Sequence, residues 1–369
     1  MGAPYRGAAG VLGIGVPATS IASYATPITA TNIFHVSGFG ASTEASGHDR
    51  RNSASGYEEG LGITPTAGIT RVSFSGDVCD TSFPILFALA LGKDYLSNPG
   101  TTAYQHLCVP VTVAQELPQT SLYFKQTALA DTTSVGSVAF HGCVLDTLTL
   151  TGSAQGVWTY SASFVTSGSG TTYATDLSSM LKPNVLPFRF GGTQAYLSGT
   201  TPTIVSSDPG TAATAVSSNT GWTLTSDFAP YLRSQTWTIN NNVQAIYTAS
   251  GTDATCVVRG TRVTTVDSTF LFEGTSGFTR TWPYTISGQT ALTHGIITRC
   301  VSSSAAGTGY NYGFELQVPK AVALKTDVAK TLGAREITIN HTVVNDSVTP
   351  ALYTLYATGW NVYNTSYTP

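Results

Sequence analysis

Apolar and small polar residues alternate without a break over Trp158–Phe164, and this alternation constrains the fold more than any other feature of the chain. Because successive side chains of a strand point to opposite faces, the pattern predicts a strand with one apolar face and one Ser/Thr face. The same pattern recurs over Tyr312–Val318 and Glu336–Val343. The chain is therefore predicted to be mainly β, with strands at Ile33–Val36, Arg71–Val78, Tyr104–Val113, Ser121–Gln126, Val138–Thr151, Val157–Thr166, Leu186–Phe190, Gln235–Asn240, Val243–Ala249, Thr255–Phe272, Tyr310–Val318, Arg335–Val344 and Leu352–Tyr363.

One helix is predicted over Asp80–Lys93. Asp80 or Ser82 can cap its free N–H groups, Pro84 suits the first turn, and Gly92 suits the left-handed position after the last turn. The segment is apolar nearly all round, which indicates a helix buried against a sheet or a neighbouring subunit. A second, very short helical turn is possible at Asp327–Leu332.

Two Gly/Ser/Thr-rich segments are predicted to be long loops, at Gly38–Gly68 and within Ser167–Arg233, and residues 1–30 are predicted to be an extended arm. The second loop region separates two halves of similar strand density. Each half also contains a Val-Pro step in a strand, at Val109-Pro110 and at Val318-Pro319. We therefore predict an N-terminal domain over residues 1–178 and a second, related domain over residues 179–369.

The composition of the 369-residue chain favours a protein that covers its surface with copies of itself. Charged residues make up 10%, against about 25% in an ordinary soluble protein, and interface cores are depleted in charge. A secreted Ser/Thr-rich β protein would have the same composition. The net charge of −3 and the absence of a basic run argue against tight phosphate binding. The mixed charges of His48–Arg51 and Glu58-Glu59 are typical of a solvated loop.

The five cysteines are an odd number and widely spaced, which favours free thiols in a reducing cytoplasm over a disulfide scaffold. No apolar run approaches the roughly 20 residues that span a bilayer, so no membrane association is expected.

The sharpest candidate for chemistry is a pair of His-x-Cys steps, His106/Cys108 and His141/Cys143. Residues i and i+2 of a strand share a face, so two adjacent strands could offer four ligands to zinc. The same residue types are also ordinary half-buried strand residues.

Three other patterns lack the context that their chemistry needs. Gly13–Ala18 does not follow a strand and open a helix as a nucleotide-binding loop must, and Ser46, His48 and Asp49 form only a local cluster. The prediction is therefore a protein that is not an enzyme, with no catalytic, cofactor-binding or metal-binding residue and no cofactor.

The order of the segments after the helix resembles that of the tail tube (major tail) proteins of long-tailed bacteriophages. The residues that carry the resemblance are Leu91-Gly92 at the end of the helix, Tyr104–His106, Leu117–Leu122, Phe140–Leu150, Trp158–Phe164, Ser234–Val243 and Gly260–Thr264. The resemblance covers residues 70–168 well and 183–275 moderately. The arm, the long loop and residues 275–309 are not matched.

The resemblance implies two tandem tail-tube domains, each a β-sandwich or barrel-like unit, with a short flanking helix and long loops. It further implies a structural virion protein that assembles in the host cytoplasm into stacked rings, the tail tube through which DNA is ejected. The expected partners are copies of the same chain, in homotrimeric or homohexameric rings, with tape-measure, tail-tip and tail-terminator proteins, while DNA only passes through the lumen. The alternative is a capsid-decorating, fibre-like or glycan-binding β protein; a glycan site would need exposed aromatic residues, whereas Trp158, Trp237 and Trp360 fall on apolar faces.

Overall fold

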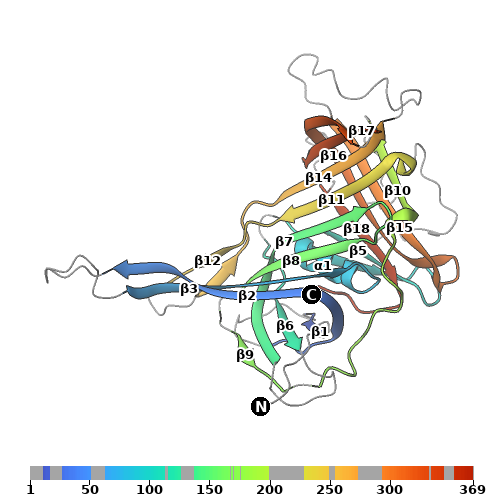
Figure 1. Ribbon diagram of the computed structural model, residues 1–369. Helices are drawn as coiled ribbons and strands as arrows, with labels where there is room; N and C mark the ends of the chain where they lie inside the picture. The colour runs from blue at the N-terminus through green and yellow to red at the C-terminus, as the bar shows by residue number, and fades with distance from the viewer. Residues whose placement is uncertain are drawn as a thin grey trace, which may run out of the picture.

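The computed structural model describes residues 11–16, 27–50, 63–112, 115–125, 137–166, 168, 170–174, 176–198, 228–248, 254–272, 293–331, 334–344 and 353–368. The protein is mainly β, as predicted, and most of its strands join one large antiparallel sheet (Figure 1). The strands are β1 (Val11–Gly15), β2 (Asn32–Arg50), β3 (Ile63–Asp77), β4 (Gly92–Ser97), β5 (Tyr104–Pro110), β6 (Thr120–Lys125), β7 (Ser137–Ser153), β8 (Thr159–Thr166), β9 (Thr171–Thr172), β10 (Thr193–Ser198), β11 (Leu232–Asn240), β12 (Gln244–Ile246), β13 (Cys256–Val258), β14 (Val263–Phe272), β15 (Thr293–Gly307), β16 (Tyr310–Thr331), β17 (Ala334–Val343) and β18 (Tyr356–Asn361). The helices are α1 (Ser82–Leu91) and the short 3-10 turns η1 (Phe190–Gly192) and η2 (Ala229–Tyr231).

Strands of the first half close on themselves in the order β7, β6, β1, β2, β3, β8 and back to β7. Strand β7 changes partner along its length: its first part pairs with β6 and its second part pairs with β8. The six strands together form a closed barrel. Alternate residues of these strands, such as Tyr160 and Phe164 on β8, are buried in the interior. Closure pairs the edges of these strands except along β2 beyond His35, where one side of the strand has no described partner.

The sheet continues without interruption from the first half of the chain into the second. Strand β11 pairs with β7 along Ser234–Asn240, and the last strand, β18, pairs with β5. One hydrophobic core contains residues of both halves. Its aromatic centre is Phe314 of β16, which stacks on Phe83 of α1 at 4.6 Å between ring centroids and meets the ring of Trp158 edge-on at 5.5 Å. The division at residues 178/179 therefore stays a prediction about how the chain is organised.

Helix α1 is confirmed, and all ten of its residues are buried, as its uniform apolar character indicated. It contacts β4, β5, β7 and β18. Gly92 ends the helix with φ 101°, a left-handed conformation that favours glycine. The predicted cap is wrong. The N-cap residue is Thr81 without a side-chain hydrogen bond, while the Asp80 carboxylate accepts a hydrogen bond from the backbone N–H of Asn184 at 3.1 Å.

The predicted loop at Gly38–Gly68 is wrong wherever its structure is described. Residues 38–50 and 63–68 belong to β2 and β3, which pair from Val36↔Gly76 as far as Arg50↔Ile63. The hairpin projects well beyond the barrel (Figure 1). Small residues misled the prediction, because Gly and Ser disfavour strands only weakly when a long partner strand supplies the hydrogen bonds. Residues 51–62 lie outside the described part of the chain.

Other expectations are corrected in the same way. Residues 11–15 of the predicted arm form β1, which sits between β2 and β6 with Leu12 and Ile14 fully buried. Asp327–Thr331 continues strand β16 instead of forming a helical turn. The predicted strand at Leu186–Phe190 is irregular apart from one bridge, Val157↔Arg189, and the 3-10 turn that begins at Phe190. Strands β10 and β15 were not predicted at all.

Candidate functional surface

Ser and Thr side chains line one face of the central sheet, and we call this surface the hydroxyl face. Paired strands carry Ser or Thr at facing positions, so one row runs through Ser75, Ser161, Thr149, Thr238, Thr265 and Thr342. The other residues of this hydroxyl face include Ser73, Thr147, Thr151, Ser153, Thr159, Ser163, Ser234, Thr236, Thr269 and Thr338. All are exposed or half-buried, whereas their strand neighbours point into the core. The hydroxyl face spans β3, β8, β7, β11, β14 and β17 and therefore includes strands from both halves of the chain.

Charges on the hydroxyl face occur mostly as opposite pairs. Arg71 lies 3.6 Å from Asp146, and Arg233 contacts Glu336. The Asn340 amide donates a hydrogen bond to Asp267 at 2.7 Å. Neighbouring opposite charges largely cancel beyond a Debye length of about 8 Å. The face is therefore polar without a strong field of either sign.

The four residues considered for zinc do not come together. His106 and Cys108 lie on β5, which pairs with β4 and β18, whereas His141 and Cys143 lie on β7. A left-handed Gly142, with φ 61°, separates the second pair: His141 approaches Ser121 at 3.0 Å, and Cys143 is fully buried. No cluster of three or more His, Cys, Asp or Glu side chains suited to a metal occurs among the described residues.

His106 instead ties the end of the chain to the sheet. Its Nδ1 atom lies 2.9 Å from the Asp94 carboxylate, and its Nε2 atom faces two acceptors, Asn361 Oδ1 at 3.2 Å and the Tyr363 carbonyl at 3.1 Å. The Tyr367 backbone N–H donates to the same carboxylate at 2.8 Å. The arrangement is a structural clasp for residues 361–368.

The structure also contains a buried histidine pair that was not predicted, although the alternation over Glu336–Val343 puts His341 on the apolar face of its strand. His294 Nδ1 and His341 Nε2 are 3.0 Å apart, and both side chains are buried. Burial, together with the charge of its partner, lowers the pKa of His341 from 6.5 to about 4, and burial lowers the pKa of His294. The pair is therefore neutral near pH 7.

This pair predicts a loss of stability in acid. The unfolded His341 binds a proton below pH 6.5 and the folded one only below about pH 4, so stability falls as the pH drops through that window. The difference corresponds to about 3 kcal/mol. We expect His341→Asn, which keeps a polar partner for His294, to lose a comparable part of the pH dependence, measured by urea unfolding at pH 7 and pH 4. An unchanged difference between the two pH values in the variant would contradict this assignment.

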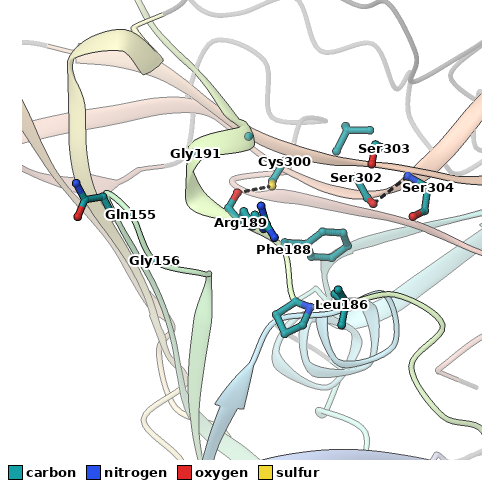
Figure 2. Close-up of a pocket in the computed structure, with 13 residues that line it drawn as sticks. Gln155, Gly156, Leu186, Phe188, Arg189, Gly191, Cys300, Ser302, Ser303 and Ser304 are labelled. Carbon is teal, nitrogen blue, oxygen red and sulfur yellow. Dashed lines mark hydrogen bonds between the residues drawn. The ribbon is translucent and has the colours of Figure 1, made fainter.

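A cavity of about 760 Å³ lies beside η1 and β15 (Figure 2). Its lining includes one charged side chain, Arg189, with Gln155 and the serines Ser302, Ser303 and Ser304. The Cys300 thiol donates to the Arg189 carbonyl at 3.3 Å, and burial raises the pKa of this thiol to about 12. Because a thiol with a raised pKa is mostly protonated near neutral pH, Cys300 is a poor nucleophile in this cavity.

No family model matches the chain, and no curated protein is significantly similar to it in sequence. In the described part of the structure, no helix has the length and apolar character needed to cross a membrane. Of the five tryptophans of the chain, Trp158, Trp237 and Trp360 are buried, as their positions in the alternating pattern predicted.

Proposed function

We propose that this chain is a structural virion protein that assembles into stacked rings and forms the tail tube of a bacteriophage. The observation that carries the proposal is the hydroxyl face, which crosses both halves of the chain as one continuous sheet surface. Such a face suits the wall of a conduit, because Ser and Thr bind water and leave a passing polyanion neither an apolar surface nor a cationic one to adhere to. The neutralised charges on this face serve the same purpose.

In this function the main partners are further copies of the chain, in trimeric or hexameric rings. Tape-measure, tail-tip and tail-terminator proteins would contact the assembled tube, and DNA would pass through the lumen during ejection. The protein would assemble in the host cytoplasm and reside in the phage tail. Electron microscopy of the concentrated protein tests the proposal: hollow tubes support it, and monodisperse particles under all conditions favour a decoration, fibre or glycan-binding protein.

The β2–β3 hairpin supplies a natural contact between stacked rings. Beyond the barrel it is a ribbon of two strands, and such ribbons are only marginally stable in water by themselves. A neighbouring copy that covers the ribbon would remove this weakness. We therefore assign the hairpin to ring stacking.

Shortening the hairpin is expected to abolish tubes without unfolding the protein. Replacing residues 46–67 by Asn-Gly keeps the Ala45↔Gly68 pair and the Thr43–Thr70 hydroxyl contact of 2.9 Å, and Asn-Gly closes a two-residue hairpin well. The melting temperature should fall by a few degrees at most, while electron microscopy should show single rings or free subunits. Tubes at the yield of the unaltered protein would show that the hairpin does not hold rings together.

A further inference from the structure

The two halves of the chain repeat one pairing scheme. In the first half β1 pairs with β6, β6 with β7, β7 with β8, β8 with β3, and β3 with β2. In the second half β10 pairs with β15, β15 with β16, β16 with β17, β17 with β14, and β14 with β11. The equivalent strands occur in the same order along the chain. Both β7 and β16 are long corner strands that change partner part-way.

Three register shifts of the two schemes coincide as well, whereas the shifts toward the ends of the β2–β3 and β15–β16 hairpins have no counterpart. The β2–β3 register shifts between Val36 and Gly38, and the β11–β14 register shifts between Leu232 and Ser234. The β7–β8 register shifts between Leu145 and Thr147, and the β16–β17 register shifts between Ala323 and Lys325. Bulges are placed individually in each sheet, so their agreement indicates one duplicated unit instead of two unrelated ones.

A third register shift and a buried cationic side chain also lie at equivalent positions in the two halves. The β6–β7 register shifts between Thr120 and Leu122, and the β15–β16 register shifts between His294 and Ile296. Lys125 pairs with Ser137 in the first unit, and Arg299 pairs with Glu315 at the equivalent place in the second. Both cationic side chains are 1% exposed.

Within the chain, the two units are joined through β7 of the first and β11 of the second, over Thr147↔Asn240 to Ser153↔Ser234. The equivalents of these strands are β16 and β2. No described strand pairs with the outer side of β16 beyond Val322, or with the outer side of β2 beyond His35. The hydroxyl face is therefore flanked by two strand edges that have no described partner, β16 beyond Val322 on one side and β2 beyond His35 on the other. These two strands are the equivalents of β7 and β11, which pair with each other at the internal junction.

We propose that β16 of one copy pairs with β2 of the next copy, in the register of the internal β7–β11 junction. This inference rests on the proposed function and names its lateral interface. Transferring the register places Lys325 opposite Glu44, Ser42 opposite Asp327 and Gly38 opposite Thr331. The first of these pairs sets a basic and an acidic residue at facing register positions, an arrangement that stabilises adjacent strands. Within its own strand the Lys325 ammonium lies 2.7 Å from the Asp327 carboxylate, so the pair across copies would extend an existing ion pair.

Two further observations fit this interface. Leu324, at the β16 bulge, is 69% exposed, so a neighbouring copy paired with this edge would remove part of its apolar surface from water. The two edges also differ from one another, so their contact is heterologous, and a heterologous contact generates a ring when the rotation between copies closes. Such a ring would continue the hydroxyl face around its inner wall, and three copies would place six equivalent units about the axis.

A charge swap tests the register. We expect Lys325→Glu or Glu44→Lys alone to raise the protein concentration needed for assembly about tenfold, and the double variant to restore it, as followed by sedimentation. Tenfold corresponds to about 1.4 kcal/mol per contact. Circular dichroism confirms that each variant is folded. If the double variant assembles no better than the single ones, the proposed register is wrong.

Cysteine cross-linking separates the failure of this interface from the failure of the tube. Thr43→Cys with Thr326→Cys should form disulfides between copies under mild oxidation, while Thr43→Cys with Val328→Cys, two residues out of register, should form at least several-fold fewer. Each single-cysteine variant controls for the native thiols. Cross-links without tubes would support the interface and reject the tail-tube function, whereas tubes without in-register cross-links would reject the interface alone.

Discussion

Replacing Glu315 with Gln is expected to destabilise the protein by about 3–5 kcal/mol, because it leaves the buried Arg299 without its counter-charge. Arg299 and Glu315 face each other on β15 and β16, 3.5 Å apart from Nε to Oε2, with each side chain about 1% exposed. The Gln317 amide also donates to the Glu315 carboxylate, and the Arg299 guanidinium lies 5.3 Å from the centre of the Trp360 ring. Burial raises the pKa of Glu315 and lowers the pKa of Arg299 to about 10.

Urea unfolding at pH 7 measures this loss, and a second variant separates its cause. Arg299→Met with Glu315→Leu removes both charges and fills a similar volume, so it should cost far less than the single change. If the double variant is as unstable as Glu315→Gln, the loss comes from packing and not from an unpaired buried charge.

Replacing Phe314 with Ala is expected to cost about 3–5 kcal/mol and to weaken both halves of the chain together. Phe314 is fully buried and packs on Phe83 of α1, on Trp158 beside β8, and on Phe188, at 5.4 Å between ring centroids. Its removal therefore leaves a cavity at the point where helix and sheets of both units meet.

Urea unfolding followed by tryptophan fluorescence and by far-ultraviolet circular dichroism measures this effect. The two signals should shift together, because Trp158 and Trp237 belong to different halves of one core. Phe39→Ala is the matched control. Phe39 stacks on Phe124 at 3.8 Å but is only partly buried, so its loss should be smaller. Two separate transitions in the Phe314 variant would show that the halves unfold independently.

Local sequence patterns predicted much of the fold, because side-chain periodicity and a glycine that ends a helix depend only on residues close together in the chain. The strand at β8 and the helix at α1 follow directly from side-chain periodicity, from Gly92 and from uniform apolar character. The sequence predicted a strand at Ile33–Val36, the beginning of β2, but not the rest of β2 and not β10. Gly38, Gly40 and Ser42 of β2 carry little strand preference of their own, and paired strands supply the hydrogen bonds of both β2 and β10.

The candidate surface was predicted only in part. Alternation gave each strand a Ser/Thr side, but it could not show that these sides line up in rows across six strands, because register depends on tertiary pairing. The zinc hypothesis failed for the same reason, since β5 and β7 each pair with other strands. The Val-Pro steps that suggested related halves do not correspond, because the equivalent of Val318 on β16 is Phe140 on β7.

The sequence by itself determined that this protein is mainly β, that one helix is buried, and that strands such as β8 have an apolar and a hydroxyl side, because these properties depend on residues close together in the chain. Only the tertiary structure decided which strands are neighbours, that Arg299 meets Glu315 and His294 meets His341, and that the two halves share a scheme of pairing and bulges. Equivalent strands such as β2 and β11 have almost no identical residues at equivalent positions. The pattern of buried positions and the turn geometry set the register, and very different side chains can satisfy the same pattern.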